Sequence, residues 1–147
     1  MTQLAQIYER NDDWYFQASS RATTGLWIAT PPLVVLNRHA PHLKKGLAAL
    51  EVLNSSREDV SLPEDTSAVI APLLSKAGVD LWPTFMKKAR YVELERENNQ
   101  LILIPNREIP RSKGSLEGIP KRSIVMSADT APEAIGLALE DAFARCE

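Results

Sequence analysis

Short segments with aromatic and β-branched residues, separated by polar turns, indicate strands in the first quarter of the chain. Trp14–Ser20 and Gly25–Thr30 have this character, and the polar segment Arg21–Thr24 between them suits a hairpin turn. The Pro31-Pro32 pair cannot donate to a strand ladder. We therefore expect an edge or a bulge at these prolines, before a short extended piece at Leu33–Leu36.

A second hairpin is predicted around Asn98-Asn99, because asparagine tolerates the positive φ angles of a two-residue turn. Its strands are Tyr91–Glu97 and Gln100–Ile104, which place an apolar set on one face and a mixed set on the other. The expected cross-strand pairs are Val92 with Pro105, Leu94 with Leu103, Glu93 with Ile104, and Glu95 with Ile102. Arg122–Met126 supplies one more strand.

Helical spacing predicts one long helix and two short ones in the middle of the chain. The long helix starts at Pro41, ends near Asn54, and carries leucines at spacings of four and three. The face that we expect to pack on the core comprises Leu43, Leu47, Leu50 and Leu53. Short helices are expected at Ala71–Ala77, ended by Gly78, and at Trp82–Ala89.

The chain ends with a helix whose start is marked by Thr130, Pro132 and Glu133. A threonine hydroxyl and a glutamate three residues later predict a capping box. The buried stripe of this helix is expected to comprise Ile135, Leu139, Ala142, Phe143 and Cys146. In the helix predicted from Pro41 to near Asn54, Gly46 permits a close approach to a neighbouring element, which we expect to be the sheet.

Two segments have the composition of loops. Ser55–Ser67 is polar and acidic, and Asn106–Pro120 carries prolines, glycines and scattered charge. The strands are joined by hairpins rather than by crossover helices, which favours an antiparallel or mixed sheet. The sequence therefore predicts an α+β fold, with a sheet of about five strands and helices packed against it, as a single domain over residues 1–147.

Composition agrees with one self-sufficient domain of 147 residues and net charge −2. A chain of this size buries roughly 70% of its unfolded surface, so its core needs neither disulfide nor metal. The single cysteine, Cys146, cannot make an internal bridge, which favours a reducing compartment. Met1–Trp14 lacks signal-peptide character, and no apolar run approaches the roughly 20 residues of a membrane span. We expect a cytoplasmic protein that binds neither membranes nor nucleic acid.

Catalytic and cofactor motifs are mostly absent: there is no phosphate-binding glycine loop, zinc-type Cys/His spacing or nucleophile elbow. We therefore expect no cofactor, no metal and no small-molecule ligand, and assign no catalytic residue. The alternative is a small RNA-processing enzyme, because His39 and His42 lie beside two lysines and histidine pairs can cleave RNA by acid–base catalysis. Pro41 separates the two histidines at a helix start, which favours a surface role for both.

Acidic residues carry the stronger functional signal. Some fall in the loop Ser55–Ser67, and others alternate along one strand beside Tyr91, Ile102 and Ile104. Each alone is typical of a solvated surface, but together they would steer a basic partner toward an apolar anchor. The candidate partner-binding residues are Glu58, Asp59, Glu64, Asp65, Tyr91, Glu93, Glu95 and Glu97.

Three segments in order resemble the immunity proteins of bacterial contact-dependent growth inhibition, the CdiI family. They read WYFQASSRATTGLWIAT, LLSKAGVDLWPTFMKKARYVELE and APEAIGLALEDAFARCE. The resemblance implies a cytoplasmic protein, without cofactor, that binds the C-terminal toxin domain of a cognate CdiA effector, often a nuclease, and blocks its activity. It implies no fixed binding residues, because each immunity protein is matched to its own toxin. We expect inhibition by covering the toxin's active site or substrate groove, with acidic side chains complementing a basic nuclease.

Overall fold

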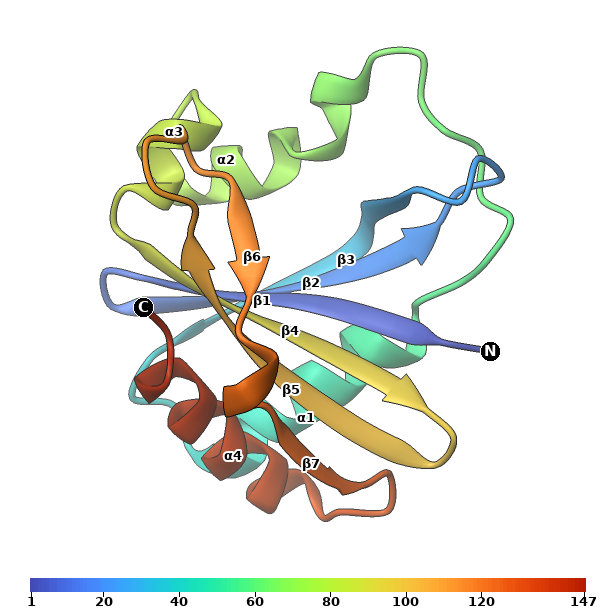
Figure 1. Cartoon of the computed structure of the whole chain (residues 1–147), viewed down its shortest axis with the longest axis vertical. Coiled ribbons are helices and arrows are strands. Elements are labelled where there is room, and N and C mark those ends of the chain that lie inside the picture. Colours follow the sequence, from blue (N-terminus) through green and yellow to red (C-terminus); the bar gives the residue numbers. More distant parts are fainter.

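Seven strands form one antiparallel sheet in the computed structural model, which describes residues 1–147 (Figure 1). The order is β3-β2-β1-β4-β5-β6, and β7 pairs with the part of β5 that β6 leaves free. The strands are β1 (Gln3–Arg10), β2 (Asp13–Arg21), β3 (Trp27–Asn37), β4 (Ala89–Glu97), β5 (Gln100–Glu108), β6 (Leu116–Gly118) and β7 (Ile124–Ser127). The α+β class is confirmed, and the expected strand number of about five was too low.

The main strand missing from the sequence prediction is β1, which lies between β2 and β4 at the centre of the sheet. Leu4 and Tyr8 are buried on one face, and Ala5 and Ile7 on the other. A strand buried on both faces loses the clear alternation that identifies an amphipathic strand. The short strand β6 was also missed, because it lies within the expected loop Asn106–Pro120.

The two expected hairpins are confirmed. β3 runs continuously through the Pro31-Pro32 pair as an edge strand, and its register with β2 shifts between Gln17 and Ala18. In the β4–β5 hairpin, Asn98 and Asn99 adopt φ angles of 51° and 62°. All the expected cross-strand pairs of that hairpin are present.

The helices lie on both sides of the sheet (Figure 1). Their bounds are α1 (His42–Asn54), η1 (Thr66–Val69), α2 (Ala71–Ala77), α3 (Trp82–Met86), η2 (Pro120–Arg122) and α4 (Pro132–Ala144), η denoting a 3-10 helix. Gly78 ends α2 with a φ of 73°, as expected. α3 ends at Met86 rather than Ala89, where β4 already begins. No helix has both the length and the apolar character needed to span a bilayer.

The face of α1 that packs on the core differs from the leucine face predicted from the sequence. Leu43 and Leu47 are 48% and 51% exposed, and only Leu53 of the four leucines is fully buried. The residues that α1 buries are mostly small: Lys45, Gly46, Ala48, Ala49, Val52 and Leu53. The prediction was wrong because a second helix, α4, packs closely beside α1 and selects its small-residue side.

Close packing of α1 on α4 depends on two glycines. A Cβ atom at Gly46 would collide with the backbone of Pro132, and a Cβ atom at Gly136 would collide with the backbone of His42. Gly46 therefore permits a close approach, as expected, but its neighbour is α4 and not the sheet. The contacts run in opposite directions along the two helices, so α1 and α4 are antiparallel.

The predicted capping box of α4 is absent. Its N-cap is Ala131, which has no side-chain hydrogen bond, and the Thr130 hydroxyl donates instead to the Ser127 carbonyl oxygen at 2.6 Å. Pro132 at the first helical position lacks an N–H group, so less capping is needed there. The expected buried stripe is confirmed, with Cys146 half-buried beyond the end of the helix.

Two apolar cores lie on opposite faces of the sheet. The larger core joins the sheet to α1 and α4 around Trp14, Phe16 and Phe143. The smaller one packs α2 and α3 over one end of the opposite face, with Tyr8 stacked on Tyr91 at 4.9 Å between ring centroids. The remainder of that opposite face has no helix over it (Figure 1).

Candidate protein-binding face

The uncovered part of the sheet, which we name the open sheet face, is built from β1, β4, β5 and β7. Direct cross-strand pairing places its side chains on one side of the sheet, opposite the larger core. These residues are Gln6, Glu93, Glu95, Ile102, Ile104 and Val125. All are half-buried except Val125, which is 57% exposed. A face with apolar side chains beside carboxylates can contact a protein that offers complementary basic groups.

The carboxylates of the open sheet face have no cationic partner within the chain. None of the seven ion pairs includes Glu93, Glu95 or the adjacent Glu97. The nearby Arg96 guanidinium donates instead to the side-chain oxygens of Gln3 and Asn54. The negative charge on this strand is therefore available to a partner.

Burial changes the protonation of these carboxyl groups. Partial burial, and then the charge of Glu95, raise the pKa of Glu93 from 4.5 to about 7. Partial burial, and then the charge of Glu97, raise the pKa of Glu95. The free protein holds Glu93 partly protonated at neutral pH, and a cation placed beside it would favour the charged form.

The acidic residues of the loop Ser55–Ser67 form a group separate from those of β4. Glu58 and Asp59 lie beside Arg21 and Gly25 at the β2–β3 turn, where Val60 bridges to Ala22. The loop and β4 come together at the end of the sheet where β1 begins. There the Ser56 hydroxyl accepts from the Leu4 N–H at 3.0 Å, and Leu4 pairs with Glu95 on β4.

The other two loop carboxylates are exposed at the start of η1. Asp65 caps this helix by accepting from the Ser67 N–H at 3.0 Å and the Ser67 hydroxyl at 2.6 Å. These hydrogen bonds lower the pKa of Asp65. Glu64 precedes it and is exposed. Asp65 therefore already has a structural role in the free protein.

Tyr91 is the candidate residue that the structure leaves least accessible. It is 7% exposed, and its ring is stacked on Tyr8 in the smaller core. Burial raises its pKa well above the ordinary value for tyrosine. The sequence predicts an apolar anchor made of Tyr91, Ile102 and Ile104, but in the free protein the accessible apolar side chains are Ile102, Ile104 and Val125. Gln6 and Val125 were missed, the former because β1 was not recognised in the sequence.

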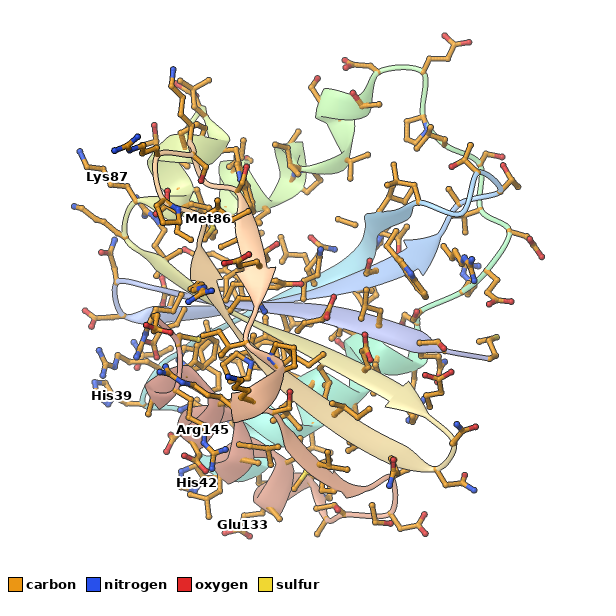
Figure 2. All side chains as sticks on the ribbon, in the orientation of Figure 1. His39, His42, Met86, Lys87, Glu133 and Arg145 are labelled. Carbon is orange, nitrogen blue, oxygen red and sulfur yellow. The ribbon has the colours of Figure 1, made fainter.

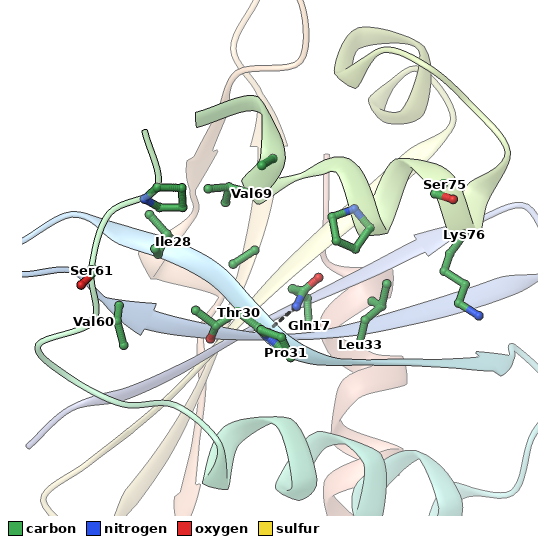
Figure 3. Close-up of a pocket in the computed structure, with 14 residues that line it drawn as sticks. Gln17, Ile28, Thr30, Pro31, Leu33, Val60, Ser61, Val69, Ser75 and Lys76 are labelled. Carbon is green, nitrogen blue, oxygen red and sulfur yellow. Dashed lines mark hydrogen bonds between the residues drawn. The ribbon is translucent and has the colours of Figure 1, made fainter. Parts of the chain in front are cut away.

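A separate groove of about 620 Å³ lies between β3 and the segment of residues 60–76 (Figure 3). Ile28, Leu33 and Val69 line it, and Lys76 is its only charged residue. At its floor, the Gln17 amide donates to the Thr30 carbonyl oxygen at 2.6 Å. The groove is in the size range of ligand pockets, but it lacks the acidic character expected of the binding surface.

The two histidines of the alternative enzyme hypothesis have different partners. His42 Nε2 lies 3.0 Å from Glu140 Oε2 on α4, and the Asn37 side chain accepts from the His39 backbone N–H. Figure 2 shows the two rings at separate positions on the side of the molecule near α1 and α4. No group of three or more His, Cys, Asp or Glu residues has metal-binding geometry. The His42–Glu140 contact joins the two helices.

Solved structures share this fold over the whole chain. A protein of unknown function from Neisseria meningitidis superposes with a TM-score of 0.82 at 21% identity, covering 100% of this chain and 96% of that one. A chain from a CdiA-CT/CdiI toxin and immunity complex of Yersinia pseudotuberculosis gives a TM-score of 0.81 at 14% identity, covering 100% and 98%. Among proteins with curated descriptions, none matches.

The class that this fold defines is an α+β protein with one helix-covered and one partly open sheet face. The family model described as CDI immunity protein, CdiI, matches residues 30–146. The chain therefore belongs to the CdiI family of immunity proteins, and the resemblance noted in the sequence is confirmed.

Proposed function

We propose that this immunity protein binds the C-terminal toxin domain of a CdiA effector and neutralises it by covering the toxin's active site or substrate groove. Membership of the CdiI family carries the proposal. The similar chain from Yersinia pseudotuberculosis comes from a complex of toxin and immunity protein. Binding alone achieves neutralisation, so the protein acts without catalysis, in the cytoplasm where the toxin is encountered.

The contact surface in this proposal is the open sheet face together with Glu97 and the four loop carboxylates Glu58, Asp59, Glu64 and Asp65. Uncompensated carboxylates beside isoleucines attract a basic surface and then exclude water around an apolar centre. A nuclease toxin has such a basic surface because its substrate is anionic. The expected interface buries roughly 1,600 Å² in total, the size of a typical stable heteromeric contact.

Co-expression with the CdiA toxin domain encoded beside this protein tests the proposal. We expect the two chains to co-purify and the cells to survive. The informative variant replaces Glu93, Glu95 and Glu97 with glutamine, which removes three carboxyl groups and keeps side-chain size. The matched control replaces the exposed Asp12, Asp80 and Asp129 with asparagine. The first variant should lose protection and the control should keep it.

Cells that die as readily with the protein as without it, together with chains that do not co-purify, would refute toxin neutralisation. Equal protection by both triple variants would instead refute the role of the β4 carboxylates. A variant with His39→Ala and His42→Ala separates binding from the enzyme hypothesis, since unchanged protection leaves catalysis by the histidines without support.

A further inference from the structure

The helical layer exposes leucines that its own fold does not use. Leu43 and Leu47 on α1 are 48% and 51% exposed, and Leu137 on α4 is 56% exposed. Scattered apolar residues on a surface need no explanation. These three differ because they come from two helices in close contact. We name the surface that they form the outer helical face.

Helix geometry places the three leucines on the same side of the α1–α4 pair. His42 contacts Gly136 and Gly46 contacts Pro132 where the helices touch, and each leucine directly follows one of these contact residues in sequence. A step of one residue turns the side chain by about 100°. In both helices, the residue that follows the contact residue therefore points away from the neighbouring helix, and the exposure of the three leucines shows that it points toward solvent. Figure 2 shows Glu133, which follows Pro132, at the outer edge of the molecule and away from the sheet.

The spacing along α1 has the form of a coiled-coil seam. Leu43, Leu47, Leu50 and Asn54 follow one another at intervals of four, three and four, which is the heptad pattern of a helix that packs against another helix. Leu50 is half-buried and Asn54 is exposed. The α1 helix has 13 residues, which gives a seam of about 20 Å.

The charges beside this seam complement those of a second copy. Lys44 and Glu51 are seven residues apart, exposed, and on the same flank of α1. Neither takes part in any of the seven ion pairs within the chain. If two α1 helices pair antiparallel about a two-fold axis, Lys44 of each copy lies near Glu51 of the other. In a parallel arrangement about a two-fold axis, the flank that carries Lys44 and Glu51 would lie on opposite sides of the seam in the two copies, so these residues could not pair.

We propose that the outer helical face is an interface between two copies of this chain, with their α1 helices antiparallel. The open sheet face lies on the opposite side of the sheet, so a dimer formed this way leaves both toxin-binding faces accessible. One dimer would thus bind two toxin domains.

Sedimentation velocity over about 1–100 µM protein tests this proposal. We expect the mass to rise from 16.3 kDa toward twice that value within this range. The variant with Leu43→Gln and Leu47→Gln should raise the dimer dissociation constant by about tenfold or more, because these side chains are solvent-exposed in the monomer and buried only in the dimer. Leu26→Gln is the matched control, since Leu26 is 57% exposed at the β2–β3 turn.

A charge exchange tests the antiparallel arrangement independently of the leucines. Lys44→Glu should weaken the dimer, and adding Glu51→Lys should restore it, because the exchange recreates both intermolecular pairs. These substitutions are at exposed positions, so they should leave the fold intact, which circular dichroism checks. A monomer at every concentration, or equal dimerisation by the leucine variant and the wild type, would overturn the proposal. Loss of toxin binding by a folded leucine variant would also overturn it, since the toxin would then be the occupant.

Discussion

Glu93 combines a half-buried position with a charge that no residue of the chain compensates. Its cross-strand neighbours are Gln6 and Ile104, which offer no positive charge. Such a residue destabilises the free protein when ionised and strengthens binding when a partner supplies a cation. In the proposed complex, this single side chain would link folding stability, pH and toxin recognition.

The stability effect of Glu93 has a definite sign. Its pKa in the folded protein, about 7, exceeds the ordinary value of 4.5. The protonated form therefore stabilises the fold below pH 4.5, and this contribution is lost as the pH rises through 7. Because the group is partly solvated, we expect Glu93→Gln to raise the free energy of unfolding at pH 8 by about 1–2 kcal/mol.

Urea denaturation at pH 5 and pH 8 measures this effect. The variant should gain stability relative to wild type mainly at pH 8. Glu64→Gln, at an exposed loop position, should follow the wild type at both values. An equal change for Glu93→Gln at the two pH values would show that burial of the carboxylate is not the cause.

Lys45 is the most deeply buried charged residue, at 1% exposure. Its Nζ lies 4.1 Å from the centre of the Trp14 ring, and it donates to Glu140 Oε1 at 2.8 Å and to the Arg38 carbonyl oxygen. The side chain thus joins α1, α4 and the sheet through a cation–π contact and a charged hydrogen bond.

Lys45→Ala should lower the free energy of unfolding by about 2–3 kcal/mol, because it removes the buried stem and leaves these polar groups without their donor. Thermal denaturation provides the measurement. The exposed Lys88→Ala should change stability by less than about 0.5 kcal/mol. Equal effects of the two substitutions would contradict a structural role for Lys45.

At the scale of elements, the contact of α1 with α4 sets the orientation of both helices. Substituting Gly46→Ala should raise the helix propensity of α1 by about 1 kcal/mol. The added methyl group, however, collides with the Pro132 backbone, which has no room to move aside as a flexible side chain would. We expect a net loss of about 2–3 kcal/mol in the free energy of unfolding.

Chemical denaturation of Gly46→Ala beside Lys76→Ala, at an exposed position of α2, measures this loss. Both substitutions introduce alanine into a helix, so helix propensity changes in a known direction at both positions. A stabilised Gly46→Ala protein would show that propensity outweighs packing and that the two helices lie farther apart.

Local sequence patterns correctly predicted the elements whose conformation is determined by residues within the element itself. The β4–β5 hairpin followed from Asn98 and Asn99, and the end of α2 followed from Gly78. β1 could not be identified by alternation, because its central position buries both faces. The orientation of α1 also escaped prediction, since the leucine periodicity is real but the core side is selected by α4, which is more than 70 residues away.

The part of the candidate site that lies on the β4–β5 hairpin was predictable, because the local turn sequence determines its register. The hairpin register placed Glu93 and Glu95 beside Ile104 and Ile102 correctly. The burial of Tyr91 depends on α3 and Tyr8, which the sequence does not place near it. The separation of the loop carboxylates from those of β4 depends on how Ser55–Ser67 runs along the β2–β3 end of the sheet.

On the scale of the whole molecule, the sheet divides the surface into two sides. The α1–α4 layer closes one side and carries the exposed leucines of the proposed dimer. The other side is covered by α2 and α3 only at one end, which leaves the carboxylates and isoleucines of the open sheet face accessible (Figure 1). Recognition of a toxin on one side and self-association on the other are therefore compatible.

The central claim is that this immunity protein works by binding a toxin domain through its open sheet face. Calorimetric titration tests this claim directly. The purified toxin domain encoded beside the immunity protein is titrated into the wild type and into the variant in which Glu93, Glu95 and Glu97 are replaced with glutamine. We predict one toxin per chain, a dissociation constant of about 1–10 nM for the wild type, and binding weakened by at least about tenfold in the variant. The account is contradicted by the absence of binding at micromolar concentrations, or by equal affinity of the two proteins.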